Sequence, residues 1–215
     1  QPVTGFQVAS VHWMPVLSAI ARYPRSMCGR YRLNRRDADQ LEADFGVPSD
    51  RVTEAMLLYG EDIRPSQSVL AIASGDDDHA DEPFVATWGV RDRFSMINTK
   101  SESLDKWQWR DWQNSRILIP ADGFFEWTGE KGSKVRHQFD AGEPIAFGGL
   151  HCDFGKGWGV TIITVPANDD VAPFHDRMPL ILRPHEFDAW AGLEFDDVRE
   201  LIRPFDGVLT ESVVG

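Results

Sequence analysis

The chain has 215 residues, a hydrophobic content of 42% and a formal net charge of −12 at pH 7. This length and composition support one well-buried domain, and no Ser/Gly-rich linker or internal repeat divides the sequence. The negative charge argues against a protein that coats duplex DNA irrespective of sequence, because Lys and Arg supply most of that affinity by neutralising phosphates. A local basic cleft remains compatible with this composition.

Two cysteines, Cys28 and Cys152, are too few for a disulfide framework, and no run is long and apolar enough to cross a membrane. Free thiols are typical of a reducing compartment, so we expect a cytoplasmic protein. His151 and Cys152 have no further ligands at the spacing of a zinc site. We therefore expect no metal and no cofactor, and we expect Cys152 to be a core thiol.

The first 26 residues show neither helical nor strand periodicity and contain three prolines. We expect residues 1–26 to be a non-native or disordered extension, and the domain to span residues 27–215 from a true start at Met27. A signal peptide is the alternative. It is disfavoured because the apolar stretch at residues 14–21 is short, is broken by a proline, and has its arginines on the wrong side.

After this extension, helical spacing predicts a helix over residues 37–45, and Gly46 is placed to end it. The pattern then changes to short segments rich in β-branched and aromatic residues, separated by Gly, Pro or acidic clusters. The predicted strands are residues 69–73, 84–88, 117–119, 123–127, 145–147 and 159–165. An acidic run between the first two strands predicts a solvated hairpin tip, formed by Asp76, Asp77, Asp78, Asp81 and Glu82.

Three further helices are predicted, over residues 101–113, 184–191 and 196–202, the second with Pro184 in its first turn. Strands dominate, and the strict strand and helix alternation of a parallel sheet is missing. The predicted fold is therefore α+β, a single domain with a largely antiparallel, barrel-like β core and peripheral helices.

The run Met27-Cys28-Gly29-Arg30-Tyr31 contains the most informative residue. Removal of a start methionine would leave Cys28 as an N-terminal cysteine, which carries a thiol and an α-amine on one carbon. The amine condenses with an aldehyde, and the thiol then closes a thiazolidine on the imine. Both groups have reactive fractions near neutral pH, since their ordinary pKa values are about 8 to 8.5. A buried, inert thiol is the alternative for any lone cysteine.

Two other segments combine polar side chains that suit catalysis or phosphate binding. In residues 97–102, Asn98 has the groups to hydrogen-bond an oxygen and Lys100 the charge to meet a phosphate, although capping of a helix N-terminus explains the same residues. In residues 174–179, the imidazole of His175 precedes Arg177, whose guanidinium suits bidentate phosphate contact. A structural polar loop is the alternative there.

A carboxylate in an aromatic strand is the third feature. In Gly123-Phe124-Phe125-Glu126-Trp127, strand alternation places Phe124 and Glu126 on one face and Phe125 and Trp127 on the other. Burial disfavours the charged form of a carboxyl group, so Glu126 is a candidate general acid or base. An edge or salt-bridged glutamate is the alternative.

These segments occur in an order that resembles the SOS-response-associated peptidase (SRAP) family, whose members covalently trap abasic sites in single-stranded DNA. The resemblance runs from Met27 to about Trp190. The matching segments are Met27-Cys28-Gly29-Arg30-Tyr31, Ile63-Arg64-Pro65-Ser66-Gln67, Trp88-Gly89, Asn98-Thr99-Lys100-Ser101-Glu102, Gly123 to Trp127 and His175-Asp176-Arg177-Met178-Pro179.

The resemblance implies a role for each site residue. Cys28 would be the nucleophile, Asn98 would position it or the sugar oxygen, Glu126 would move protons, and His175 would assist at the aldehyde oxygen. Phosphate contacts and base stacking complete the implied site: Arg30, Lys100 and Arg177 would contact phosphates, and Pro65 and Trp88 would pack against bases.

The implied partner is single-stranded DNA containing abasic sites, with no membrane and no metal, bound by a monomer that is nucleoid-associated when on damaged DNA. The expected activity is DNA–protein crosslinking, with strand cleavage by β-elimination and self-processing as further activities of such a site. Two alternatives stay open: a thiol peptidase that removes its own leader before Cys28, and a non-covalent single-strand binder.

The sequence departs from the family pattern in three places. Lys100 replaces an arginine and loses the bidentate fork. The segment after Trp88-Gly89 is short and lacks the second tryptophan that usually follows. The family also continues past a final strand, whereas this chain stops at Gly215, so truncation at the C-terminal end is an expectation too.

Overall fold

The computed structural model describes residues 29–73, 82–91, 95–153 and 158–214. Within these residues the strands are β1 (Tyr31–Leu33), β2 (Gly60–Ile63), β3 (Ser68–Ala73), β4 (Glu82–Thr87), β5 (Val90–Arg91), β6 (Ser95–Met96), β7 (Asn98–Lys100), β8 (Arg116–Thr128), β9 (Val135–Asp153), β10 (Trp158–Pro166), β11 (Arg177–Pro179), β12 (Ile181–Leu182) and β13 (Thr210–Val214). The α-helices are α1 (Ala38–Phe45), α2 (Trp107–Arg110) and α3 (Phe187–Gly192), and short 3-10 helices span Ser49–Arg51, Glu54–Met56, Ser101–Ser103, Pro184–Glu186 and Arg199–Leu201.

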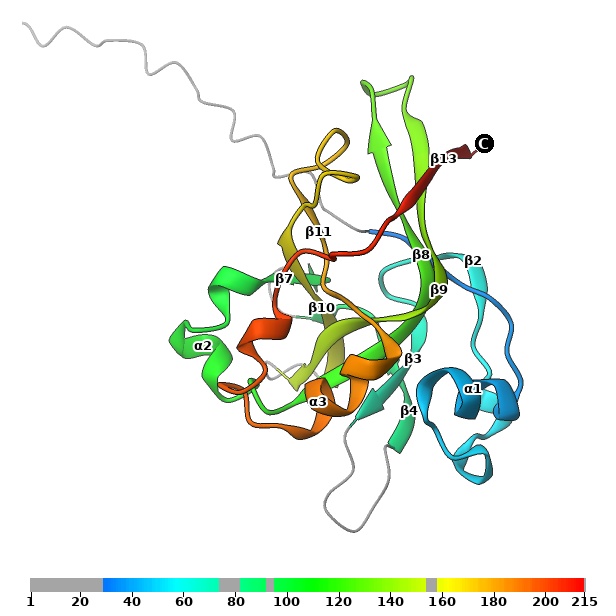
Figure 1. The fold of residues 1–215 in the computed structure, drawn as a ribbon, viewed down its shortest axis with the longest axis vertical. Coiled ribbons are helices and arrows are strands. Elements are labelled where there is room, and N and C mark those ends of the chain that lie inside the picture. Colours follow the sequence, from blue (N-terminus) through cyan, green and yellow to red (C-terminus); the bar gives the residue numbers. More distant parts are fainter. Residues whose placement is uncertain (1–28, 74–81, 92–94, 154–157, 215) are drawn as a thin grey trace, which may run out of the picture.

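The long strands β8 and β9 form the centre of an eleven-stranded sheet, with the main order β11-β10-β9-β8-β1-β2. The sheet is branched because β9 is long enough to pair with β8 and β10, and also with β12 and β13 along other parts of its length. Almost all pairs are antiparallel; β7 runs parallel to β10. Figure 1 shows the β8–β9 hairpin projecting from the body with β13 beside it, and the helices at the periphery of the sheet. The predicted fold class is confirmed.

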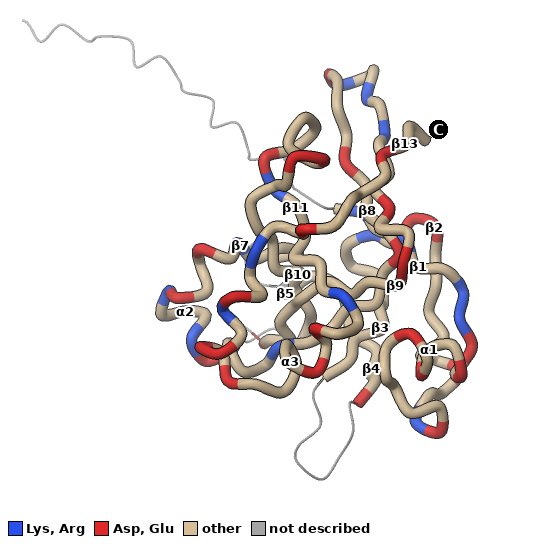
Figure 2. Tube along the Cα trace, in the orientation of Figure 1, with Lys and Arg blue, Asp and Glu red and all other residues tan. Residues whose placement is uncertain are grey.

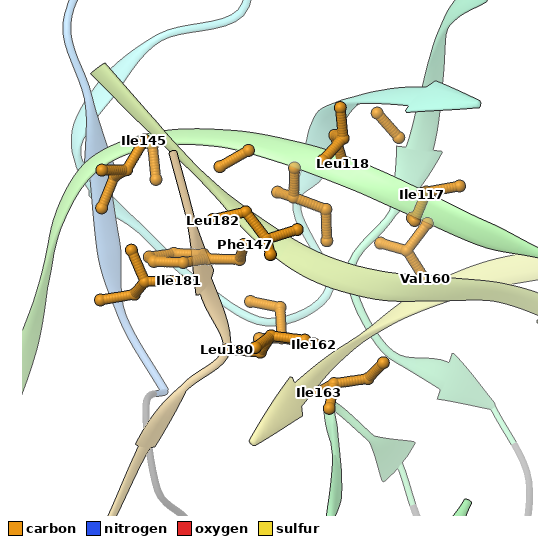
Figure 3. Close-up of a cluster of buried hydrophobic side chains, with 14 of the residues drawn as sticks. Ile117, Leu118, Ile145, Phe147, Val160, Ile162, Ile163, Leu180, Ile181 and Leu182 are labelled. Carbon is orange, nitrogen blue, oxygen red and sulfur yellow. The ribbon is translucent and has the colours of Figure 1, made fainter. Parts of the chain in front are cut away.

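The core lies where β8, β9, β10 and β12 enclose aliphatic side chains (Figure 3). Helix α3 covers this core, and the indole Nε1 of Trp190 donates a hydrogen bond to the carbonyl of Ile117 at 3.0 Å. Helix α1 joins the same layer through stacked rings of Phe45 and Phe187, whose centroids are 5.9 Å apart. Packing at this apolar end of the molecule holds in place the central strands on which the candidate site is built.

Helix α1 confirms the prediction for residues 37–45. The carboxylate of Asp37 accepts from the backbone N–H of Gln40, whose side chain accepts from the N–H of Asp37 in return. Gly46 ends the helix in the left-handed conformation, with φ 71°. The local sequence was sufficient to predict this helix because the residues that cap its two ends lie in or next to the segment.

The predicted helix over residues 101–113 is wrong for most of its length. Only a 3-10 turn at residues 101–103 and the four residues of α2 are helical. Trp107 is 81% exposed, whereas Trp109 is buried. Residues two apart point in different directions on a helix, so the tryptophans did not define a helical stripe. The predicted helix over residues 196–202 is likewise reduced to a 3-10 turn, whereas a 3-10 turn followed by α3 covers the predicted helix over 184–191.

The strand predictions are mostly confirmed, with two of them merged. Residues 117–119 and 123–127 belong to one strand, β8, because the pairing with β9 shifts register between Ala121 and Gly123 rather than ending there. Strands β3 and β4 form the predicted hairpin, with Ala73 opposite Glu82. Its predicted acidic tip lies outside the described residues, apart from Glu82 itself. The sequence did not predict the parts of β9 on either side of residues 145–147, and it did not predict β1, β2, β5, β6, β7, β11, β12 or β13.

Candidate functional site

The segment that follows Cys28 lies against the Gly-Phe-Phe-Glu-Trp strand. Tyr31 pairs with Phe124, and the backbone N–H of Phe125 donates to the carbonyl of Arg30 at 3.1 Å. Cys28 itself lies outside the described residues, and Gly29 is the first residue described. Two motifs that are almost 100 residues apart in the sequence are therefore adjacent strands of one sheet.

Glycine at position 123 lets β8 lie close to its other neighbour, β9. A Cβ atom added to Gly123 would lie 2.4 Å from the carbonyl oxygen of Phe139, and real Cβ atoms do not come so close to backbone. Packing therefore explains why the motif begins with glycine, because β8 lies between β1 and β9 at this point.

An open cleft of about 900 Å³ begins at Gly29. Its floor and walls come from the start of the described chain, the loop after β2, the β8–β9 hairpin and the end of β13, and Figure 2 shows Lys and Arg along that hairpin. The lining residues are Gly29, Arg30, Asp62, Arg64, Pro65, Ile97, Trp127, Lys134, Val135, Arg136, Val213 and Val214. Four basic side chains and one carboxylate line a cleft in a chain of net charge −12, so the charge of this region is opposite to that of the whole.

Three arginines in the cleft converge on the single carboxylate. Arg30 Nη1 donates to both oxygens of Asp62 at 2.9 and 2.7 Å, and Arg64 Nη2 donates to Asp62 Oδ2 at 2.7 Å. Arg136 Nη2 lies 3.5 Å from Asp62 Oδ1, and its guanidinium stacks over the Phe125 ring at 3.7 Å from the centroid. We call Arg30, Asp62, Arg64 and Arg136 the cleft cluster.

The cleft cluster keeps Asp62 ionised. Desolvation on its own would raise the pKa of the Asp62 carboxyl, but hydrogen bonds from Arg30 and Arg64 and the charge of Arg136 outweigh it and hold the pKa below its usual value. One carboxylate does not satisfy three guanidiniums, however. Nε and Nη2 of Arg136 are buried and have no hydrogen-bond partner among the described residues.

Glu126 is 4% exposed on the face of β8 opposite to Trp127. Its position in the strand confirms the alternation predicted from the sequence, since Trp127 lines the cleft and Phe124 lies in the core. Across the hairpin, Glu126 stands opposite His137 of β9. A buried carboxyl group on a rigid central strand is suitably placed to move protons without changing its position.

His137 was not identified from the sequence. Its Nδ1 lies 2.6 Å from Glu211 Oε1 of β13, and its Nε2 lies 2.7 Å from Thr128 Oγ1. The ring of Phe174 packs on it, with centroids 4.6 Å apart. Through these contacts the strand opposite Glu126 is tied to β13 and to the loop that carries His175.

In that loop, His175 Nδ1 accepts from the backbone N–H of Arg177 at 3.0 Å. The exposed carboxylate of Asp176 lies at the same distance from Nδ1, but the backbone N–H is an obligatory donor, so we assign the proton of the neutral ring to Nε2. The contact of Phe174 with His137 places this loop beside the strand pair that carries Glu126. The catalytic roles of Glu126 and His175 stay predictions.

Arg177 is 9% exposed, and its guanidinium is bound within the protein. Its two terminal nitrogens donate to the two carboxylate oxygens of Glu102 at 2.7 and 2.9 Å, and it also donates to the carbonyl of Thr164. We call Glu102, Thr164 and Arg177 the buried cluster, after the buried side chains of Thr164 and Arg177; the side chain of Glu102 is 57% exposed. It joins the Asn98–Glu102 segment to the His175–Pro179 segment. Sequence reasoning did not foresee this contact; the predicted phosphate contact of Arg177 stays a prediction.

Asn98 and Lys100 lie on β7, which runs parallel to β10 with Asn98 opposite Ile162. Thr99 between them is buried, and its hydroxyl hydrogen-bonds Thr161 at 3.0 Å. Lys100 is exposed. Ile97, which precedes Asn98, lines the cleft, so this segment reaches the same region as Gly29. The alternative for this segment, side-chain capping of a helix N-terminus, is not observed, because residues 98–100 form a strand and the 3-10 turn that follows has no side-chain cap.

The two residues predicted to pack against bases, Pro65 and Trp88, lie in different environments. Pro65 lines the cleft. Trp88 is fully buried, its Nε1 donates to the carbonyl of Ile97 at 2.9 Å, and its ring packs edge-on against Tyr31. Stacking of Trp88 on a base therefore stays a prediction that requires the indole to leave this position.

Cys152 is a fully buried thiol in β9, as predicted, and desolvation together with the charge of Asp153 raises its pKa to about 12. Among the described residues, no three His, Cys, Asp or Glu side chains are grouped to hold a metal ion. In the same part of the chain, no helix has the length and hydropathy needed to cross a membrane.

A profile of the family described as SOS response associated peptidase (SRAP) matches residues 27–214. The chain belongs to the SRAP family.

Curated relatives of this SRAP chain carry a common description. It is 30% identical over 183 residues to "Abasic site processing protein YedK" of Escherichia coli (strain K12), covering 76% of this chain and 79% of that protein. It is 28% identical over 199 residues to "Abasic site processing protein YoqW" of Bacillus subtilis (strain 168), covering 84% and 88%.

Solved structures show the same fold. A protein from Bordetella bronchiseptica superposes with a TM-score of 0.71 at 21% identity, covering 87% of this chain and 100% of that one. A protein from Bacteroides thetaiotaomicron superposes with a TM-score of 0.69 at 19% identity, covering 87% and 92%. The predicted family is thus confirmed by sequence and the predicted fold by structure.

Proposed function

We propose that this protein senses abasic sites in single-stranded DNA and forms a covalent thiazolidine crosslink to them through Cys28 as its mature N-terminal residue. The observation that carries the proposal is the basic cleft that begins at Gly29, one peptide bond after Cys28. A phosphate backbone lying in this cleft would bring its sugar to the α-amine and thiol of that residue. Membership of a family with relatives named for abasic site processing supports the same substrate.

The chemistry uses few groups. The α-amine of Cys28 attacks the aldehyde of the ring-opened deoxyribose, and loss of one water gives an imine. The thiol then adds to the imine carbon, its proton goes to the nitrogen, and the five-membered ring closes. Overall, one water leaves and one N–C bond and one S–C bond form. No metal, oxidant or reductant is needed for this balance.

The described residues would assist in separate ways. Glu126, buried on a central strand, would carry the protons of sugar ring opening and of water loss. His175 would donate its Nε2 proton at the aldehyde oxygen, because its Nδ1 is held by the backbone of Arg177. Asn98 would orient Cys28 or the sugar. Arg30 and Pro65 line the cleft; Arg30 would contact a phosphate and Pro65 would contact a base. In a separate step, β-elimination from the imine would cleave the strand.

The test compares two purified forms, one that begins at Gln1 and one that is started at Met27. Each is incubated with single-stranded DNA containing one abasic site. Intact mass and a denaturing gel read out the product. We expect only the form with Cys28 at its N-terminus to gain the mass of the DNA less one water, and Cys28→Ala to abolish this product. If both forms bind DNA and neither shifts, the non-covalent binding module is correct instead.

The self-processing alternative gives a different result. A thiol peptidase that removes its own leader would show Cys28 as its N-terminus even when expressed from an upstream start, and Cys28→Ala would retain the leader. Glu126→Gln separates catalysis from binding: we expect it to slow crosslinking more than it weakens DNA affinity, and parallel losses would remove its assignment as a proton carrier.

A further inference from the structure

The single carboxylate of the cleft cluster is in an unusual position for a nucleic-acid cleft. Asp62 lies on β2 at the point where Arg30, Arg64 and Arg136 converge, so the centre of the basic region is already occupied by an anion of the protein itself. A DNA phosphate that meets these guanidiniums has to compete with Asp62 for the same donors. From this juxtaposition we propose that Asp62 is an internal substitute for a backbone phosphate, which DNA displaces when it binds. The inference rests on the proposed function.

The geometry matches that of a bound phosphate. Arg30 Nη1 bridges both oxygens of Asp62, and Arg64 donates to Oδ2 through Nη2 at 2.7 Å and Nε at 3.2 Å. Such short, charge-assisted contacts are the ones that arginine makes to carboxylates and phosphates alike. A backbone phosphodiester has two charged oxygens, as a carboxylate has, but its tetrahedral centre also carries two ester oxygens. It therefore offers acceptors in more directions than the planar carboxylate of Asp62 does to three converging guanidiniums.

Arg136 supplies the second, independent observation. Its Nε and Nη2 are buried without a hydrogen-bond partner among the described residues, and Nη2 is 3.5 Å from Asp62. Buried donors without acceptors are costly, so their presence next to an open cleft points to an acceptor that arrives with a ligand. Arg136 is also held in place by the Phe125 ring, which limits its freedom to turn to solvent.

Arg64 is held on a rigid turn. Its backbone N–H donates to the side chain of Gln67 at 2.6 Å, and Ser66 adopts φ 71°, a left-handed conformation that is uncommon for a residue other than glycine. The N–H of Ser66 donates to the carbonyl of Trp88 at 2.7 Å, which fixes the turn to the sheet. The backbone that carries Arg64 is therefore held independently of the contact between Arg64 and Asp62.

The function of this arrangement is discrimination against weak, indiscriminate binding. While Asp62 occupies the arginines, an undamaged strand gains less from them than it would from an unobstructed basic cleft. A strand that also reacts with Cys28 is retained covalently. Asp62 would thereby lower the affinity for intact single strands without preventing capture of a damaged one.

The test measures binding of a labelled, undamaged oligothymidine by fluorescence anisotropy, using the full chain. We expect Asp62→Asn to bind about tenfold more tightly than wild type, which corresponds to about 1.4 kcal/mol. Glu61→Gln is the matched control, because it removes the same charge from the neighbouring residue. The side chain of Glu61 is 80% exposed and lies 3.8 Å from Arg32 rather than in the cleft cluster, so its affinity should stay near that of wild type.

Equal or weaker binding by Asp62→Asn would overturn the inference and make Asp62 a support for the arginines. A double-mutant cycle with Arg64→Ala guards against a general effect of charge: removal of Arg64 should weaken binding more in the Asp62→Asn background, where this arginine is free for DNA. Equal effects in both backgrounds would also overturn it. If no form, Asp62→Asn included, binds the oligothymidine, the inference is also overturned. Failure of the proposed function is a distinguishable result, because it shows as the absence of a crosslinked product with abasic-site DNA.

Discussion

The cleft cluster and the buried cluster both combine guanidiniums with a carboxylate, but the two clusters have different roles. In the buried cluster, one guanidinium meets one carboxylate through two hydrogen bonds, and the backbone of Thr164 takes a remaining donor. In the cleft cluster, three guanidiniums share the carboxylate of Asp62, and Nε and Nη2 of Arg136 have no hydrogen-bond partner among the described residues. The first arrangement joins two segments of the fold, whereas the second leaves binding capacity for a ligand. Balance of donors and acceptors, rather than charge alone, distinguishes a structural arginine from a binding one.

Removal of Arg177 tests the structural side of this comparison. We expect Arg177→Met to lower the free energy of unfolding by about 2 kcal/mol, because hydrogen bonds to Glu102 and to the backbone of Thr164 are lost at a buried position. Urea denaturation measures the loss. The matched variant is Arg64→Met in the cleft cluster, where the side chain is 56% exposed, and its loss should stay below about 0.5 kcal/mol. Equal losses in the two variants would erase the distinction between the clusters.

Removal of Arg136 should give the reverse result. Methionine keeps the packing on Phe125 and eliminates the buried donors, so we expect the stability of Arg136→Met to be no lower than that of wild type. Its affinity for single-stranded DNA should fall about tenfold, and the slope of log affinity against log salt should become shallower by about 0.7, as expected for one phosphate contact. A clear loss of stability with unchanged affinity would show that Arg136 is structural.

The difference between the two clusters also explains how far the sequence could be interpreted. Helix α1 and the main strands were predictable because their signals are local: caps for the helix, and β-branched or aromatic runs for the strands. Strand β1 was not, since its three residues form a strand by pairing with β2 and β8, which are both distant in the sequence. The helix expected over residues 101–113 failed because long-range contacts at Glu102 and Trp109 determine that segment.

The site residues divide in the same way. The motifs predicted Glu126, His175 and the segment after Cys28 as site residues, and the structure shows that the strands and the loop that carry them are neighbours. They did not identify Asp62 or His137, because an aspartate in a short strand and a histidine in a β-hairpin carry no sequence signal without their partners. A weak signal existed for Arg64, which stands beside Pro65 in a family motif, but its convergence with Arg136 depends on the fold.

A change of pH tests the contact between Glu102 and Arg177 without a mutation. Hydrogen bonds from Arg177 lower the pKa of Glu102 to about 2, from an ordinary value of 4.5. Because the folded pKa is depressed, this contribution to stability is present above about pH 4.5 and is lost as the pH falls towards 2. The side chain of Glu102 is 57% exposed, so we expect only about 1 kcal/mol. Urea denaturation across this range should show a loss that Glu102→Gln lacks; parallel curves for the two proteins would contradict the assignment.

The smallest effect is expected at the second cysteine, which lies in the apolar end of the molecule, away from the basic cleft. Burial raises the pKa of the Cys152 thiol to about 12, so almost none of it is thiolate at neutral pH. Cys152→Ala should therefore form the covalent DNA product at the wild-type rate, and iodoacetamide should label Cys152 only after unfolding. These two results together would leave Cys28 as the reacting thiol. Loss of the product in Cys152→Ala, with the product retained in Cys28→Ala, would instead reverse the roles of the two cysteines and require the core at β9 to open for the reaction.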